Sequence, residues 1–182
     1  MTSFYLNIPA VVILVLFTLS ANGVFAQENQ EELGPKNKIA LLSGYTWVPQ
    51  GRNAETEKKE FILVPNFGLA YEYWFNEKWA IGTYNELEII NISVEQDENQ
   101  YIDRENVMTF TLGATYRILE IWTVTAGIGV ETDKNETLRV GHFGTECIIL
   151  EKGNTELSVE LTYTSKDIYD AVTIGLVLGK KF

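Results

Sequence analysis

The chain of 182 residues has one cysteine, one histidine and four prolines, and its 14 Lys and Arg are outnumbered by 25 Asp and Glu. A single cysteine, Cys147, excludes any disulfide within the chain. With one histidine as well, the chain cannot form a Cys/His zinc site from its own side chains. The net charge of −11 argues against nucleic-acid binding, which needs clustered Lys and Arg to neutralise phosphates. The length predicts one domain.

The first 26 residues lack charged side chains altogether. They contain an apolar run over 8–19, and Val24-Phe25-Ala26 has the small-x-small pattern of a cleavage site before Gln27. An uncleaved anchoring helix is the alternative, but a span needs about 18 or more apolar residues. We therefore expect residues 1–26 to be a cleaved signal peptide, followed by a short periplasmic leader over 27–37.

From Lys38 onward, helical spacing is almost absent, and apolar residues recur at every second position. This period is typical of β-strands with two different faces. Most of the predicted strands have ten or more residues, whereas strands usually have about 5–6, and a tilted strand needs about 9–11 to cross a bilayer. Eight strands are predicted, over 38–48, 61–74, 79–94, 106–118, 121–131, 137–150, 155–165 and 169–181.

The links between these strands differ in length. The first two odd-numbered links, 49–60 and 95–105, are long and polar, whereas the even-numbered links are tight turns. Such an asymmetry is typical of a transmembrane barrel whose tight turns face the periplasm. The later odd-numbered links, near 132–136 and 166–168, are short, so the asymmetry is only half developed.

The two faces of the strands differ in composition. One face carries large apolar and aromatic side chains, and the other is rich in Gly, Ala, Ser and Thr with a few isolated charges. A water-facing surface is normally much denser in charge, and small residues fit the narrow interior of an eight-stranded barrel. We therefore expect the polar face inside and the apolar face in lipid. The alternative is a secreted, soluble, lipocalin-like barrel that binds an apolar ligand inside.

A signal peptide, eight long alternating strands and a terminal Phe182 resemble the small outer-membrane β-barrel family of Gram-negative bacteria, the outer-membrane protein A and X type. The resemblance implies an all-β, eight-stranded, antiparallel, up-and-down transmembrane barrel over 38–182, a porin-like β-barrel domain of the cell envelope. It also implies that the assembly machinery recognises the last strand through Phe182. Ile174, Leu176 and Leu178 share the face of Phe182 as in the family, whereas Lys180 departs from its pattern.

Two positions complicate the pattern. Pro65 lies inside the strand predicted at 61–74 and lacks the N–H of a ladder donor, which predicts a bulge. The strand at 137–150 does not choose a face clearly. We expect His142 and Glu146 to point inward, because the opposite phase would place a carboxylate in lipid. Phe143, Cys147 and Ile149 then point outward.

This register places charged residues inside the barrel. Buried charges must be paired or hydrated, so the mid-strand residues form a candidate polar network of the lumen that plugs the barrel with salt bridges and water. A cation-selective or proton-permeable path is the alternative. The predicted network consists of Glu72, Glu86, Arg117, Glu146 and Glu160. Glu88, Glu131, Glu156, Lys38 and Lys181 are also expected to point inward.

No catalytic, metal or cofactor site is expected. Some eight-stranded outer-membrane barrels modify lipid A with a Ser and a His, but here His142 has no Ser within two residues, although Thr145 is near. The acidic stretch 95–105 could gather divalent cations, yet it lacks the spacing of a calcium loop, and a solvated loop is expected. The sequence thus predicts a non-enzymatic outer-membrane monomer with a role in envelope integrity or surface interaction. Its expected partners are outer-membrane lipid, lipopolysaccharide and the barrel assembly machinery.

Overall fold

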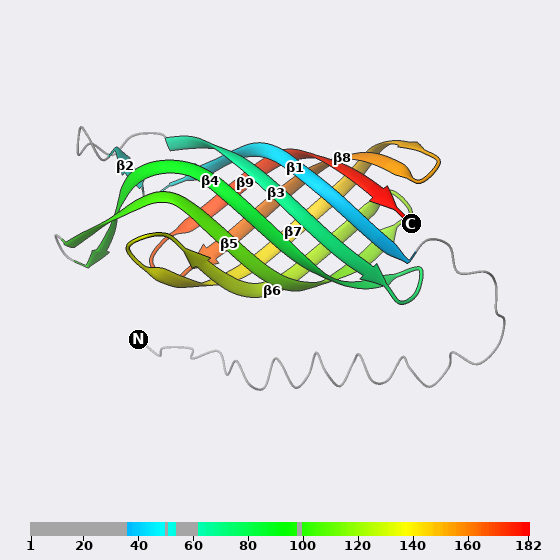
Figure 1. Cartoon of the computed structure of the whole chain (residues 1–182), viewed down its shortest axis with the longest axis horizontal. Coiled ribbons are helices and arrows are strands. Elements are labelled where there is room, and N and C mark those ends of the chain that lie inside the picture. The colour runs from blue at the N-terminus through cyan, green and yellow to red at the C-terminus, as the bar shows by residue number, and fades with distance from the viewer. Residues whose placement is uncertain (1–35, 50, 54–61, 98–99) are drawn as a thin grey trace, which may run out of the picture. The chain divides into compact units, whose positions relative to one another are not determined.

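The structure is a computed structural model that describes residues 36–49, 51–53, 62–97 and 100–182 (Figure 1). The predicted signal peptide over 1–26 lies outside the described residues, and so does most of the predicted leader over 27–37. Asn37, the last residue of that range, already belongs to the first strand. Among the described residues, no helix has the length and hydropathy needed to cross a membrane.

The described chain consists of strands, and the eight long ones correspond to the eight predicted from the sequence. Their bounds lie within two residues of the predicted ones except in the hairpin β4–β5, which is longer than expected. The strands are β1 (Asn37–Val48), β2 (Gly51–Asn53), β3 (Ile62–Trp74), β4 (Trp79–Asp97), β5 (Gln100–Leu119), β6 (Trp122–Thr132), β7 (Thr137–Lys152), β8 (Thr155–Lys166) and β9 (Asp170–Lys181).

The eight long strands close into an antiparallel barrel (Figure 1). Strands that follow one another in the chain pair side by side, and β1 closes the ring by pairing with β9 as well as with β3. The short β2 pairs with β4 at Gly51↔Val94, beyond the last β3–β4 pair at Asn66↔Glu88. The predicted eight-stranded up-and-down barrel is therefore confirmed, with β2 as an addition at its rim.

The two ends of the barrel differ. We call the end with the links 75–78, 120–121 and 153–154 the turn end. The end with the links 133–136 and 167–169, where β2 pairs with β4, is the loop end. Both termini of the barrel lie at the turn end, where the backbone N of Asn37 donates to the carbonyl of Phe182 at 3.0 Å and the reverse bond is 2.8 Å long. The strand ends are thus joined as the closed topology requires.

The prediction of a long loop over 95–105 is wrong. β4 and β5 continue as a paired hairpin to Asp97↔Gln100, with register shifts at Glu88/Asn91 and Glu95/Asp97. Within the hairpin, the Ser93 hydroxyl donates to Asp103 Oδ1 at 2.7 Å. Cross-strand pairs of this kind stabilise a ladder even where the sequence is polar, so charge alone did not distinguish strand from loop.

The bulge expected at Pro65 is also absent from the pairing of β1 with β3, where Tyr45↔Pro65 continues the regular register. Pairing of β3 with β4 begins only at the next residue, Asn66↔Glu88. The missing N–H of Pro65 therefore interrupts no β3–β4 ladder bond, because the proline sits where that ladder has not yet started. The irregularity lies instead in β4, at the register shift after Glu88.

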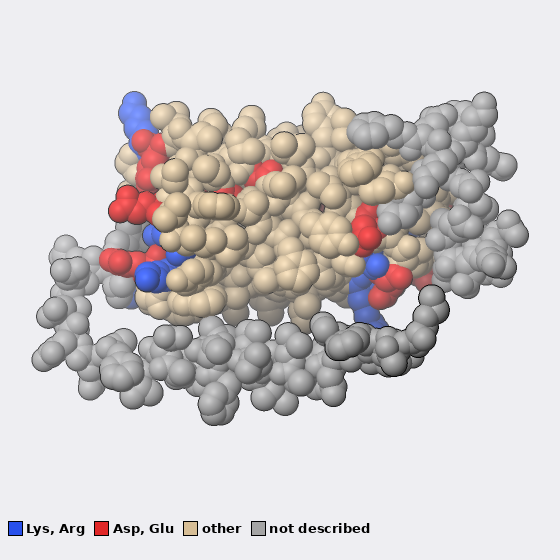
Figure 2. Space-filling view, turned by 180° about the vertical axis from the view of Figure 1, so that it is seen from behind, with Lys and Arg blue, Asp and Glu red and all other residues tan. Residues whose placement is uncertain are grey.

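The faces of the strands are distributed as the alternation predicted. Large apolar side chains are exposed on the outside, including Leu41, Phe67, Leu112 and Leu176, and they form a broad band without much charge between two charged ends (Figure 2). On β7 the expected phase is confirmed: His142 is buried, whereas Phe143, Cys147 and Ile149 are exposed. The interior carries Thr, Gly and charged side chains over most of its length.

A cluster of buried apolar side chains lies at the loop end of the lumen. They belong to the last residues of β1, the loop-end parts of β4 and β5, the first residues of β3 and β7, and the link before β9. We call this group the apolar cap, and it consists of Val48, Val64, Ile90, Ile92, Val94, Val107, Leu138 and Tyr169, with Ile62 and Ile168 packed against it.

Candidate functional site

The turn-end half of the lumen is organised around Lys38 of β1, which is 4 % exposed. Its Nζ lies 2.7 Å from Glu156 Oε1, 3.0 Å from Glu146 Oε1 and 3.9 Å from Glu72 Oε2. The three carboxylates come from β8, β7 and β3, so one ammonium joins three walls of the barrel. Together with Lys181, which binds Glu156 at 2.6 Å, they form what we call the turn-end network.

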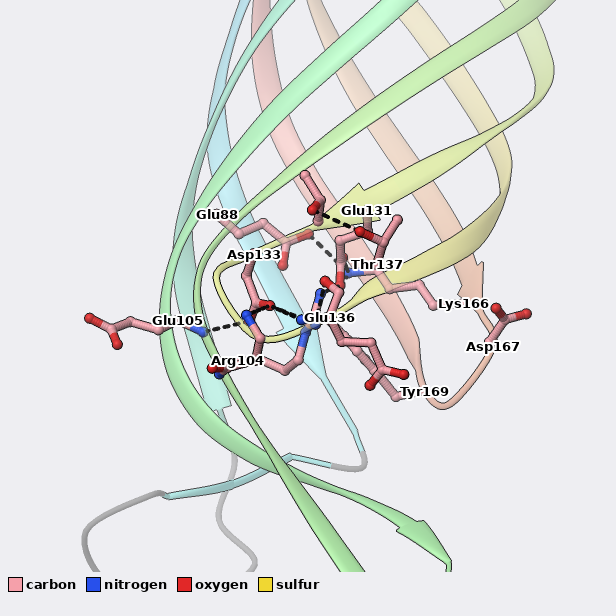
Figure 3. A network of polar contacts seen from close by, with 12 residues as sticks. Glu88, Arg104, Glu105, Glu131, Asp133, Glu136, Thr137, Lys166, Asp167 and Tyr169 are labelled. Carbon is pink, nitrogen blue, oxygen red and sulfur yellow. Dashed lines mark hydrogen bonds and ion pairs between the residues drawn. The ribbon is translucent and has the colours of Figure 1, made fainter.

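The loop-end half holds a second group of buried ion pairs, shown in Figure 3. Arg104 Nη2 lies 2.7 Å from Glu131 Oε1 and its Nη1 lies 3.0 Å from Asp133 Oδ1. Lys166 pairs with the same Glu131, and its Nζ lies 3.3 Å from Glu88 Oε1. Two cations thus share one carboxylate in a place where water has little access. We call Glu88, Arg104, Glu131, Asp133, Lys166 and Tyr169 the loop-end network.

Asp133 fixes the link between β6 and β7. Its Oδ1 accepts hydrogen bonds from the backbone N of Asn135 and of Glu136, both at 2.8 Å, and its Oδ2 accepts one from the backbone N of Glu105 at 3.2 Å. Burial alone would raise the pKa of the Asp133 carboxyl, but these backbone donors and the Arg104 guanidinium outweigh it and hold the pKa below its ordinary value. Asp133 therefore stays ionised and ties the link to β5.

Between the two networks lie two glutamates without a cation. Glu86 Oε2 accepts a hydrogen bond from Asn66 Nδ2 at 2.6 Å, and Glu160 Oε1 accepts one from the Thr162 hydroxyl at 2.8 Å. In the part of the chain that the structure describes, neither forms an ion pair. An unpaired carboxylate in a narrow interior must be hydrated or hydrogen-bonded. The carboxylates in the middle of the lumen are therefore less fully balanced by cations than those at its two ends.

His142 lies in the same middle section. Its ring stacks on Tyr84 with centroids 5.6 Å apart and planes 17° apart. Both ring nitrogens are buried and have no hydrogen-bond partner among the described residues. Thr145, the hydroxyl nearest in sequence, faces the other side of the wall and accepts a hydrogen bond from Trp122 Nε1. The geometry therefore does not join His142 to a nucleophile.

The cavity beside Lys38, Tyr84, Glu86 and Glu160 has a volume of about 30 Å³, which is room for about one water molecule. At the turn end the barrel opens into a vestibule of about 700 Å³, lined by Trp74, Arg117, Lys181 and the tight turns. At the loop end the ion pairs and the apolar cap occupy the lumen.

The structure places the predicted network residues as follows. Glu72 and Glu146 meet at Lys38, whereas Glu86 and Glu160 bind Asn66 and Thr162 in the middle section. Arg117 forms no ion pair with any of the four in the described part of the chain. Its guanidinium carbon stacks 4.2 Å from the ring centroid of Trp74, beside the vestibule. The cation that holds Glu72 and Glu146 is Lys38.

Sequence reasoning missed Arg104, Asp133, Lys166 and Tyr169. Lys166 could have been found, because it continues the inward alternation of Glu156, Glu160 and Thr162 one step past the predicted strand end. Arg104 and Asp133 gave no such signal. Both stood in ranges read as links, and near Arg104 the alternation is interrupted by the register shift after Glu88 and by the positive φ of 49° at Asn106.

The described residues contain no group of three or more His, Cys, Asp or Glu side chains arranged to hold a metal ion. Phe182 is exposed at the turn end, and its part in recognition by the assembly machinery stays a prediction. The acidic hairpin over 95–105 also stays untested as a site for divalent cations.

No protein-family model matches the sequence, and no curated protein matches it. Solved structures with a similar shape include Ail, the attachment invasion locus protein of Yersinia pestis, at 16 % identity over 81 % of this chain and 99 % of Ail, with a TM-score of 0.49. OprG, an outer membrane protein of Pseudomonas aeruginosa, has 12 % identity over 82 % and 97 %, with a TM-score of 0.42. A designed transmembrane β-barrel has 11 % identity over 83 % and 99 %, with a TM-score of 0.44. The fold assignment rests on the strand pairing of this chain itself.

Proposed function

We propose that the chain is a non-enzymatic outer-membrane β-barrel with a closed lumen, which contributes to envelope integrity or presents its loop end for surface interaction. The observation that carries this proposal is the inverted distribution of side chains. Lys38, Glu131 and Lys166 are buried inside with their partners, whereas Leu112, Ile128 and Leu176 are more than half exposed outside. Such an outer face is stable in lipid and costly in water.

Strand length supports the same placement. The regular strands β1, β3, β6, β8 and β9 have 11 to 13 residues, and a tilted strand needs about 9–11 to cross a bilayer. A closed antiparallel ring also leaves no unpaired backbone edge within the band, which the hydrocarbon interior demands. With the tight turns toward the periplasm, the hairpin β4–β5 projects from the outer surface.

The interior does not favour the soluble alternative. A lipocalin-like barrel needs an apolar cavity for its ligand, but here the middle of the lumen holds carboxylates and a cavity of about 30 Å³. The same filling opposes a wide diffusion pore. We therefore infer that the barrel acts as a rigid membrane anchor rather than as a channel or a carrier.

Three measurements test this proposal together. The chain should fractionate with outer membranes after removal of residues 1–26, and it should migrate differently on a gel before and after boiling. In planar lipid bilayers it should show little or no steady conductance. A chain that stays soluble without detergent would contradict the membrane placement, and large stable channels would contradict the closed lumen.

The remaining expectations belong to this proposal. They are an outer-membrane monomer without a cofactor, contacts with outer-membrane lipid and lipopolysaccharide, and assembly through the last strand with Phe182. A Phe182→Ala variant should assemble more slowly into outer membranes than the parent chain while refolding normally from urea into detergent. Equal assembly of both chains would show that Phe182 is not needed for recognition by the assembly machinery.

A further inference from the structure

The vestibule at the turn end is a cavity that lies beyond the turn-end network. Its volume of about 700 Å³ is within the range of about 300–1,000 Å³ of small-molecule sites. Trp74 of β3, which is 7 % exposed, and Arg117 of β5 line its inner part. The tight turns surround its mouth. The vestibule therefore has an inner wall against which a ligand can rest.

Trp74 is a fixed platform in this wall. Its Nε1 donates to Glu72 Oε2 at 2.9 Å, and its backbone N donates to the carbonyl of Lys36 at 2.7 Å. The guanidinium carbon of Arg117 lies 4.2 Å from the centroid of the Trp74 ring. Stacking on an indole face is favourable for a guanidinium and restricts its orientation. The N–H donors of Arg117 are thus held in place before any ligand binds.

Arg117 lacks an anionic partner in the part of the chain that the structure describes. Its guanidinium forms no ion pair or hydrogen bond with the described residues, and its Nε is buried without an acceptor. A guanidinium presents paired N–H donors that match the two oxygens of a carboxylate. Because a buried donor without an acceptor costs free energy, an oxyanion that binds beside Trp74 satisfies donors that the chain itself leaves unmatched.

The charges around the vestibule select among oxyanions. Of the described residues that line it, four are Lys or Arg and three are Glu. Lys181 is already paired, with Glu151 at 3.0 Å and with Glu156 at 2.6 Å. A ligand with several phosphates would be repelled by the nearby carboxylates, whereas a single carboxylate needs only the guanidinium of Arg117. The vestibule therefore favours a ligand with one negative group.

The wall formed by the β5–β6 turn adds two further features. Ile118 and Leu119 line the vestibule and are 47 % and 55 % exposed, so they offer apolar surface to a ligand. Glu120 follows them and forms no ion pair with the described residues, and its carboxylate is an acceptor for N–H donors. The C-terminal end of a peptide carries the three matching groups, a carboxylate, an apolar side chain and N–H donors, whereas a fatty acid lacks the donors.

We propose that the vestibule binds the C-terminal end of a periplasmic peptide whose last residues are apolar. The terminal carboxylate lies on Arg117, the apolar side chains lie against Ile118 and Leu119, and a peptide N–H or amino group donates to Glu120. The proposal rests on the proposed placement of the turn end toward the periplasm. It adds a ligand class and a site outside the two polar networks, and it needs no passage through the lumen.

The test uses the full chain, folded in detergent, and isothermal titration calorimetry. The probes are the peptide alanyl-leucyl-leucine, the same peptide with a C-terminal amide, and octanoate. We expect the free acid to bind at least tenfold more tightly than the amide, which lacks the charge that Arg117 matches, and more tightly than octanoate. Arg117→Gln should weaken binding of the free acid about tenfold and remove its preference over the amide. Leu119→Ser should weaken both peptides alike.

Lys180→Gln is the matched control. Lys180 is an exposed cation at the turn end, on the outer face and outside the vestibule, so its removal changes the net charge equally and should leave all affinities unchanged. Equal binding of acid and amide, a preference that survives Arg117→Gln, or octanoate binding as tight as that of the peptide would overturn the proposal. If the chain fractionates with outer membranes and shifts on the gel when boiled but shows no such preference, the vestibule proposal fails alone. A chain that stays soluble without detergent would contradict the membrane placement and, with it, the periplasmic source of the peptide.

Discussion

The hydroxyl of Tyr169 donates a hydrogen bond of 2.6 Å to Glu131 Oε1 inside the barrel. Tyr169 belongs to the link before β9 and Glu131 to β6, and these elements are not neighbours in the sheet. The bond therefore crosses the lumen. Lys166 and Arg104 converge on the same carboxylate, so Glu131 is the point at which four separate parts of the wall are joined.

Replacing Glu131 should destabilise the barrel strongly. Glu131→Gln leaves Lys166 and Arg104 buried with too little negative charge, and breaking such a pair costs about 3–5 kcal/mol. We expect a loss of that size in the free energy of unfolding by urea, measured in detergent or vesicles. Glu151→Gln is the control, because Glu151 is half exposed and pairs with Lys181 at the rim. A Glu131→Gln barrel as stable as the control would refute the role of the loop-end network.

Replacing Lys38 should destabilise the barrel as strongly, because it leaves negative rather than positive charge unpaired in the lumen. Lys38→Met removes the ammonium that lies close to Glu72, Glu146 and Glu156 and leaves their carboxylates repelling one another in the lumen. We expect a loss of about 3–5 kcal/mol in the free energy of unfolding. Adding Glu146→Gln to this variant should restore part of the loss. Two additive losses would mean that the residues do not interact.

Replacing Glu160 in the middle of the lumen should stabilise the barrel. Glu160 has no cation in the described structure, so Glu160→Gln removes the cost of burying an unpaired carboxyl group and keeps the acceptor for Thr162. We expect the free energy of unfolding at neutral pH to rise by about 0.5–2 kcal/mol, the usual size of a stabilising substitution. Glu146→Gln, which takes a partner from Lys38, should lower it. If both substitutions lower the free energy of unfolding equally, Glu160 forms a stabilising ion pair and is not an unpaired carboxyl group.

Asp133 should make stability depend on pH in acid. Its pKa is lower in the folded chain than in the unfolded one. Its contribution is therefore fully present above the unfolded value of about 3.9, and it is lost as pH falls through the folded value. The difference in unfolding free energy between the parent chain and Asp133→Asn should be about 1–3 kcal/mol at neutral pH and shrink in stronger acid. A difference independent of pH would contradict the ionised state of Asp133.

The sequence predicted the barrel well because one physical rule acts on every strand. A wall with lipid-compatible and lumen-facing sides forces a period of two, and residues as far apart as Trp122 and Leu178 obey it. The rule failed where the chain leaves the barrel. At 95–105 the hairpin continues on cross-strand bonds between polar residues, and a pattern based on hydrophobicity cannot detect such bonds.

The candidate site was less accessible to sequence reasoning. Alternation assigned Glu72, Glu86, Glu146 and Glu160 to the interior, but it gives no height along the barrel and no partner across it. Lys38 was placed inside yet near a strand end, and the structure makes it the centre of the turn-end network. The loop-end network depends on Arg104 and Asp133, whose positions follow from a left-handed backbone at Asn106 and from a tight link.

The proposed membrane placement requires the apolar outer face to contact lipid, and a probe at position 128 tests this most directly. In a Cys147→Ser background, Ile128→Cys carries a nitroxide on the most exposed of the large apolar positions that the structure describes. The collisions of the nitroxide with oxygen and with a water-soluble nickel chelate are measured by electron paramagnetic resonance in reconstituted vesicles. We expect high accessibility to oxygen and almost none to the chelate. A nitroxide at position 128 that collides freely with the chelate would show that the apolar wall faces water.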